Sequence, residues 1–188
     1  MGRRRTSAVP ASDLAGGHFD AALRNGYGQW PGLRAAKLFP SIFTPLCVPE
    51  LRAAAEGLSD PRSLAVPLLG RPDWWEIWYR ALGIAESPPP SSFGTSLATE
   101  HLDITAALAG HGIAIGSPIL FQSEIDAGCL ITPHEMVASD GREFWLTYPI
   151  TRQCIAKIGH LRDWLLAEAE ASLHGARFYI DKTVAIFE

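Results

Sequence analysis

The chain has 188 residues, a length that fits one domain or two small lobes. Hydrophobic residues make up 47% and charged residues 19%, which allows a buried core and argues against a disordered chain. The net charge of -4 disfavours autonomous nucleic-acid binding, because the surface as a whole repels phosphate groups. Three widely spaced cysteines without a CxxC pair argue against a disulfide framework or a zinc site and favour buried free thiols. No apolar run approaches the roughly 20 residues that a membrane-spanning helix needs, so a soluble cytoplasmic protein is expected.

The first part of the chain predicts strands separated by turns. Residues 1–12 are predicted to be an irregular lead, and the apolar run FDAALR over 19–24 predicts a buried strand. The turn residues of 25–32 predict a loop. Residues 37–48 are rich in β-branched and aromatic side chains but contain two prolines, which predicts a kinked or edge strand. Residues 49–57 predict a short helix that begins at a proline and stops at a glycine.

A longer helix is predicted over residues 71–82, between a proline in its first turn and a glycine after its end. Trp74 and Trp78 are four residues apart and share one face of this helix, which favours core packing over an aromatic cage for a cationic ligand. The stretch ESPPPSS over 86–92 then predicts a linker.

Strands and helices alternate again after the linker. Thr99 is predicted to cap a helix that runs to about residue 109, and Glu100 adds negative charge to its first turn. The other predicted elements are strands over 93–98, 113–115 and 144–148, a helix from Pro118 to near 128, and an amphipathic helix over 155–171. This alternation on both sides of a linker indicates an α/β fold with two lobes.

The chemical signatures of common enzymes do not occur in this sequence. The glycines of GHGIAIG, over 110–116, end a helix and surround a strand, whereas a dinucleotide loop must follow a strand and open a helix. There is no GxSxG, GxxxxGK[ST] or HExxH motif, and the six histidines lack metal-ligand spacing. Neither a cofactor nor a metal is therefore expected. A small cytoplasmic hydrolase or transferase with a dispersed active site is the alternative, because catalytic triads assemble from residues far apart in sequence.

Five segments occur in a characteristic order: FDAALRNGYGQWPGLRAAKLF, FTPLCVPEL, RPDWWEIWYRALG, AALAGHGIAIGSPILFQSEIDAGCLI and RDWLLAEAE. Together they resemble the effector-binding, or substrate-binding, domain of LysR-type transcriptional regulators, in particular the subgroup of the glycine-cleavage regulator. The resemblance implies a small-molecule sensor that is not an enzyme. It also implies that the helix-turn-helix DNA-binding domain, the long linker helix and the first strand, helix and strand of lobe one are missing.

The resemblance further implies a two-lobed fold similar to type II periplasmic binding proteins, with the first lobe incomplete. The effector-binding domain is then expected over 13–170. Lobe one would comprise 13–89 plus 153–170, and lobe two 93–152. Residues 171–188 depart from the family as a divergent tail, and their alternating apolar side chains predict a strand.

In such a fold a small molecule binds where strand ends and helix N-termini face a cleft. The candidate ligand-binding residues are Arg24, Asn25, Thr44, Thr99, Glu100 and His101. Arg24 could pair with a carboxylate of the effector or form a surface salt bridge. Thr99 could bind the effector or serve only as the helix cap, and His101 could be an ordinary satisfied polar residue. Glu100 would repel an anionic effector and favour a cationic or amino-bearing one.

The expected partner is thus a small-molecule effector. We expect no direct DNA binding by this chain alone and no membrane association. A homodimer, or an association with full-length regulators, is a further hypothesis.

Overall fold

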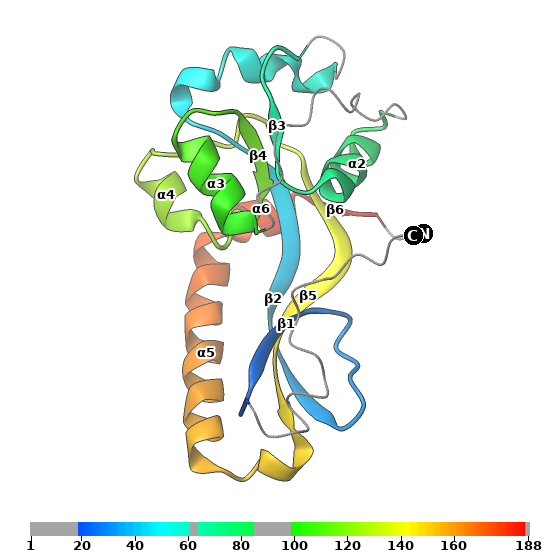
Figure 1. Cartoon of the computed structure of the whole chain (residues 1–188), viewed down its shortest axis with the longest axis vertical. Helices are drawn as coiled ribbons and strands as arrows, with labels where there is room; N and C mark the ends of the chain where they lie inside the picture. The colour runs from blue at the N-terminus through cyan, green and yellow to red at the C-terminus, as the bar shows by residue number, and fades with distance from the viewer. Residues whose placement is uncertain (1–18, 61–63, 85–98, 187–188) are drawn as a thin grey trace. The chain divides into compact units, whose positions relative to one another are not determined.

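The computed structural model describes residues 19–60, 64–84 and 99–186 (Figure 1). The chain divides into two compact units, which we call unit 1 and unit 2. Unit 1 is formed by residues 1–41 and 142–171, and unit 2 by residues 42–141 and 172–188. The lobes expected from the sequence have other bounds, and that division stays a prediction. The expected irregular lead, the linker over 86–92 and the strand over 93–98 lie outside the described residues.

Unit 1 contains a small antiparallel sheet covered by a long helix. Strand β1 (Ala22–Gly26) pairs with β5 (Val137–Pro149), and β5 also neighbours β2 (Leu33–Leu46). Helix α5 (Ala156–Gly175) runs beside these strands in Figure 1. The core of unit 1 is built from apolar side chains of the helix and of β2 and β5: Leu38, Leu146, Tyr148, Ile158 and Ala169.

Unit 2 is layered, with a sheet between helices. Strand β3 (Leu68–Leu69) runs parallel to β4 (Ile113–Gly116), and β4 pairs antiparallel with the end of β2. Successive side chains of a strand point to opposite faces, and the core divides accordingly. Leu68, Ile113 and Ile115 pack in one cluster with helix α2 (Pro72–Ala81). Leu69 and Ala114 pack in a second cluster with helix α3 (Glu100–Leu108).

The aromatic side chains of α2 form the centre of the first cluster. Trp75, Trp78 and Tyr79 are buried, and the Trp75 indole N–H donates to the Leu69 carbonyl at 2.9 Å. The Phe43 and Trp74 rings stack with centroids 4.6 Å apart. The expectation of core packing over residues 71–82 is thereby confirmed.

Several predicted elements differ from the observed ones. The helix expected over 49–57 is two 3₁₀ helices, Pro49–Leu51 and Ala54–Ser59, and the helix after Pro118 is the short α4 (Gln122–Asp126). Strand β1 extends into the region predicted as a loop. The described residues contain no helix that is long and apolar enough to cross a membrane.

The tail prediction is wrong for its first half. The tail forms helix α6 (Arg177–Asp181) before strand β6 (Thr183–Ala185). Alternating apolar residues could not exclude a single helical turn, which is closed here by bonds from the Tyr179 and Ile180 amides to the Ala176 carbonyl.

The expectation of buried thiols holds for one cysteine of three. Cys47 is buried, and burial raises the pKa of its thiol to about 11. Cys129 and Cys154 are exposed, because apolar neighbours in sequence do not determine which face of the chain is covered.

Candidate functional site

The candidate site in unit 2 lies where two parallel strands end and two helices begin (Figure 1). Arg71 follows β3 and is the N-cap residue of α2, while Ser117 follows β4. Glu100 is the first residue of α3. The carboxyl ends of parallel strands meet at one edge of a sheet, and ligands of α/β proteins commonly bind beyond this edge.

The Glu100 carboxylate is joined to the end of β4. Its Oε1 accepts the Ser117 backbone N–H at 2.7 Å. A Cβ atom added at Gly116 would lie 2.8 Å from Ile104 Cδ1 and 3.3 Å from Glu100 Oε1, so the close approach of helix and strand requires glycine at this position.

Burial raises the pKa of Glu100, and the negative charge of Asp103 acts in the same direction. The Ser117 N–H and the positive charge of Arg71 oppose this shift. Glu100 is therefore a partly desolvated carboxyl group for which a nearby positive charge is favourable.

Arg71, the cation that lowers the pKa of Glu100, is itself engaged by another carboxylate. Arg71 donates from Nε to Asp73 Oδ1 at 3.2 Å and forms an ion pair with the second oxygen of the same carboxylate. Its guanidinium carbon lies 4.7 Å from the centroid of the Trp74 ring. Among the described residues, the region thus combines the acidic side chains of Asp73, Glu100 and Asp103 with the guanidinium group of Arg71.

Ser117 also contributes an unusual buried hydroxyl. Its side chain is 1% exposed, and Oγ has no hydrogen-bond partner among the residues that the structure describes. A buried polar atom without a partner is costly, so a ligand or solvent contact at this hydroxyl would be favourable.

Thr44, another predicted site residue, lies on the strand next to this edge. Its Cα pairs with that of Gly116, and its side chain is fully buried. The Thr44 hydroxyl donates to the Met136 carbonyl at 2.9 Å, as does the Trp78 indole N–H. The hydroxyl is thus already used in the core, although the backbone of Thr44 supports the strand that carries Gly116.

Thr99 and His101 flank Glu100 on exposed positions. Thr99 is the N-cap residue of α3, as predicted, and its carbonyl accepts the N–H groups of Leu102 and Asp103. Its hydroxyl makes no capping bond within the described part of the chain, so the side chain differs from an ordinary cap. The His101 ring stacks near Phe121, with centroids 6.4 Å apart.

Arg24 and Asn25 lie in unit 1, on β1. Their Cα atoms pair with those of Trp145 and Phe144. The Arg24 guanidinium carbon lies 5.8 Å from the centroid of the Trp30 ring, and Asn25 is exposed. The structure therefore groups Thr44, Thr99, Glu100 and His101 within unit 2 and places the remaining two candidates in the other unit.

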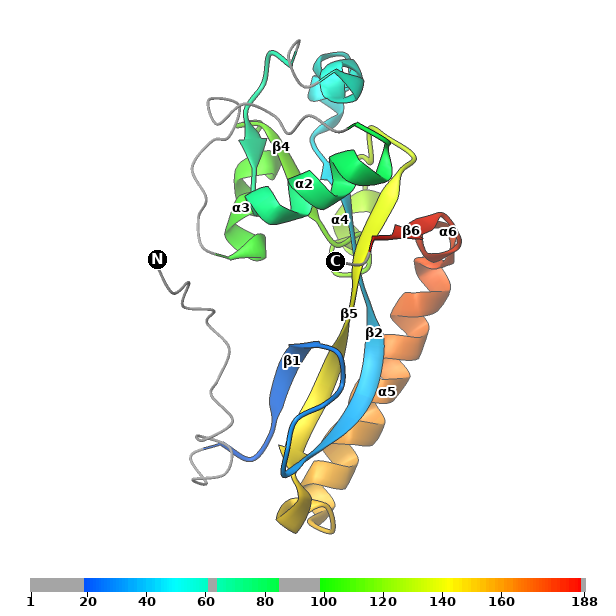
Figure 2. The same cartoon turned by 90° about the vertical axis from the view of Figure 1, so that its right-hand side faces the viewer.

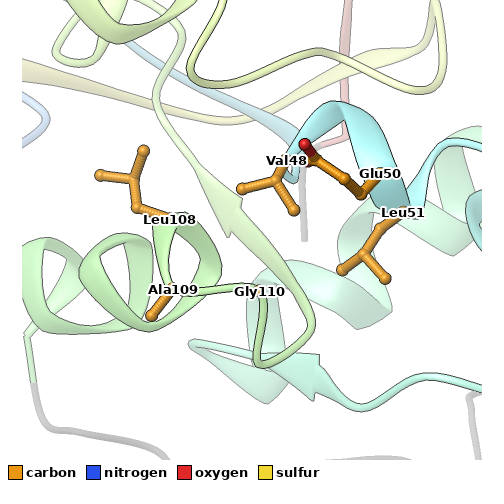
Figure 3. Close-up of a pocket in the computed structure, with 6 residues that line it drawn as sticks. All are labelled: Val48, Glu50, Leu51, Leu108, Ala109 and Gly110. Atoms are coloured by element: carbon orange, nitrogen blue, oxygen red, sulfur yellow. The ribbon is translucent and has the colours of Figure 1, made fainter.

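A separate hollow of about 360 Å³ lies at the C-terminal end of α3 (Figure 3). It is lined by Val48, Glu50, Leu51, Leu108, Ala109 and Gly110. Most of these side chains are apolar, and only Glu50 carries a charge. Since ligand sites combine apolar surface with several convergent polar groups, the opposite end of α3 has the more suitable chemistry.

Sequence reasoning missed Arg71, Asp103 and Ser117. A signal for two of them exists: a glycine followed by a polar residue at the end of a buried strand, in Gly70–Arg71 and Gly116–Ser117. The parallel pairing of β3 and β4 brings these two positions to the same edge, and pairing is not visible in a single sequence.

Comparison with known proteins points to one family. Residues 4–170 match the family model described as LysR substrate binding domain. The chain is 32% identical over 163 residues to the glycine cleavage system transcriptional activator of Escherichia coli (strain K12), covering 85% of this chain and 52% of that protein. It is 31% identical over 166 residues to the HTH-type transcriptional activator AmpR of Pseudomonas aeruginosa, covering 87% of this chain and 54% of that protein. The chain thus spans about half the length of these curated relatives.

A solved structure of a relative has a similar fold. The effector domain of the transcriptional regulator AmpR of Pseudomonas aeruginosa superposes with a TM-score of 0.71 at 28% identity, covering 87% of this chain and 78% of that one. The expected α/β fold similar to type II periplasmic binding proteins is confirmed by this likeness.

Proposed function

The chain belongs to the LysR substrate-binding domain family, and from this membership we propose that it is the effector-sensing part of a LysR-type transcriptional regulator. Its role in this proposal is to bind a small molecule and not to catalyse a reaction. The main support for a site at the edge where β3 and β4 end is the Glu100 carboxylate, which accepts a hydrogen bond there from the Ser117 amide.

We propose that the effector carries a positively charged or amino group that approaches Glu100. Two features of the described residues support this chemistry. Burial disfavours the ionised form of Glu100, so a cation beside it would be stabilising. Arg71 is engaged by Asp73, and Asp103 adds further negative charge.

The exposed side chains of Thr99 and His101 would then contact the rest of the effector, together with the Ser117 hydroxyl, which has no partner in the described part of the chain. Arg24 and Asn25, on β1 of unit 1, remain ligand-binding residues predicted from the sequence. Thr44 would act by supporting the Gly116 strand, since its hydroxyl is bonded to Met136.

The test is a thermal-shift screen with matched compounds, followed by calorimetry. The compounds are alkylamines, diamines and amino acids, each compared with a carboxylic acid of the same size. We expect amino-bearing compounds to stabilise the wild-type protein and Glu100→Gln to weaken their binding at least about tenfold, as expected for loss of a charge-assisted contact. The matched control is Glu50→Gln, which removes an exposed carboxylate near the other end of α3 and should bind like the wild type.

Two further variants test the position of the site. Thr99→Ala should weaken binding of the same compound, and Arg24→Ala tests separately whether the residue predicted in unit 1 contributes to binding. If both variants bind like the wild type, the effector site lies elsewhere. If only carboxylic acids bind, the proposed amine chemistry is wrong.

We also propose that this chain acts in the cytoplasm and that its partners, besides the effector, are other regulator chains and not DNA. The net charge of -4 supports the absence of autonomous DNA binding. A gel shift with the DNA upstream of its own gene should show no specific complex at moderate salt, and a salt-resistant band would refute this part of the proposal.

A further inference from the structure

The C-terminal segment supplies an extra strand to unit 2 (Figure 2). This segment lies beyond residue 170, where the family match ends. Strand β6 runs parallel to the first residues of β5, with Ala138 opposite Val184 and Ser139 opposite Ala185. The ladder is extended by the Ile186 N–H, which donates to the Ser139 carbonyl at 2.9 Å.

The part of β5 that β6 covers belongs to the core of unit 2. Val137, Ala138 and Ser139 are all buried. The Ile186 side chain packs against the cluster that contains Ala138 and the tryptophans of α2. Without β6, the backbone groups of β5 on this side would lose their hydrogen-bond partners, and unpaired strand edges readily accept another strand.

Side-chain contacts add a second point of attachment. Lys182 comes directly before β6, and Glu135 comes two residues before the start of β5. The two side chains form an ion pair, with Nζ and Oε2 2.9 Å apart. The same ammonium lies 4.2 Å from the centroid of the Phe178 ring. The segment is therefore recognised by its backbone, by one apolar side chain and by one charge.

The attachment is nevertheless small. Strand β6 has three residues, and Phe178 and Val184 are 58% and 38% exposed. So short a strand remains bound because it is part of the same chain, since tethering gives a local concentration on the order of millimolar.

We propose that the edge of β5 over residues 137–139 is a strand-accepting site whose ligand is the C-terminal segment of this chain, and that a second copy can supply that segment in place of the molecule's own. In the structure the chain fills its own site. When the intramolecular strand is released, the same edge binds the corresponding strand of another copy, by the backbone recognition that proteins use for added β-strands. This inference rests on strand pairing and is independent of the effector site.

Two proline variants distinguish the loss of pairing between β6 and β5 from a general effect of proline on the tail. In a parallel ladder, residues alternate between those directing N–H and C=O groups to the partner strand and those directing them away. Because the Ile186 N–H points to β5, that of Ala185 points to the other side. Ile186→Pro removes the N–H that donates to Ser139. Ala185→Pro introduces a proline at the neighbouring position but leaves the hydrogen bonds between β6 and β5 in place.

The probe is a fluorescein-labelled peptide of residues 177–188, RFYIDKTVAIFE, added to the full-length protein and followed by fluorescence anisotropy. We expect saturable binding to Ile186→Pro, and binding at least about tenfold weaker to the wild type and to Ala185→Pro, whose own strands compete at high local concentration. A peptide with proline in place of Ile186 should not bind to any of them.

Near-ultraviolet circular dichroism of the buried tryptophans checks that unit 2 stays folded in each variant. Should Ile186→Pro lose this signal, Ile186→Asp keeps the N–H and replaces the apolar contact by a charge, and it should also bind the peptide. The proposal is overturned if folded variants do not bind the peptide, or if the wild type binds it with the same affinity.

Discussion

The Ser117 amide donates to the Glu100 carboxylate at 2.7 Å and so joins the end of β4 to the first turn of α3. The two residues are 17 positions apart in the chain. One oxygen of the carboxylate thus has a structural role, and the same group supplies the negative charge of the proposed effector site. The two roles can be separated, because a hydrogen-bond acceptor does not need to be charged.

Replacing Glu100 should affect stability in a way that depends on the new side chain. Glu100→Ala leaves the buried Ser117 N–H without its acceptor, which should lower the free energy of unfolding by about 1–3 kcal/mol. Glu100→Gln keeps an acceptor oxygen and should cost much less. Urea unfolding at neutral pH measures both values, and equal losses in the two variants would show that the hydrogen bond is not the reason.

Thr44 and Trp78 should be coupled through the Met136 carbonyl, which accepts a hydrogen bond from each. Thr44→Val leaves the Trp78 bond in place and should cost about 0.5–1.5 kcal/mol. In Thr44→Val/Trp78→Phe the carbonyl loses both donors, so the loss should exceed the sum of the single losses by about 1 kcal/mol. A double-mutant cycle from urea unfolding gives this coupling energy, and strict additivity would argue against a shared acceptor.

Gly112 should be far less replaceable than Gly110, although both have positive φ angles, +155° and +78°. A Cβ atom at residue 112 would lie 2.4 Å from the Pro67 carbonyl oxygen, which accepts the Ile113 N–H of the β3–β4 pair. Gly112→Ala should cost about 2–4 kcal/mol because backbone must move. At Gly110 no described atom lies within 4 Å of the added carbon, so Gly110→Ala should cost only about 1 kcal/mol, for its backbone conformation. Thermal unfolding of the two variants compares them directly, and similar melting temperatures would contradict the clash.

His134 should make stability depend on pH. Its Nδ1 accepts the Met136 N–H at 2.9 Å, which requires the neutral ring, and burial lowers the pKa of His134 below its ordinary 6.5. The unfolded chain therefore binds a proton more readily than the folded one. Stability is full above pH 6.5 and falls as the pH drops below it towards the folded pKa.

Urea unfolding between about pH 7.5 and 5.5 tests this dependence, over the range where histidine titrates. His134→Gln should remove part of the loss, whereas His111→Gln, at an exposed position, should leave it unchanged. A wild-type slope that persists in His134→Gln would assign it to another group.

Local signals in the sequence were sufficient for α2, α3 and β4. Pro72 in the first turn and Gly83 after the last turn mark the two ends of α2, and Thr99 marks the start of α3. These signals involve residues within one or two turns, so they act whatever the rest of the chain does. The ordered segments also carried enough information to identify the family. For the tail, the same local reasoning was insufficient, because a five-residue helix and a three-residue strand have no clear period.

The candidate site depended on tertiary structure. Glu100 could be selected from the sequence as a charge at a helix start, but its partner Ser117 follows a strand, and the parallel register of β3 and β4 brings Arg71 to the same edge. Thr44 could be selected as polar and near a strand end, yet its hydroxyl is bonded to Met136, 92 residues away. Sequence patterns determine which residues form an element and which face is apolar. The pairing of distant strands decides which polar groups meet, because that choice depends on the packing of the whole core.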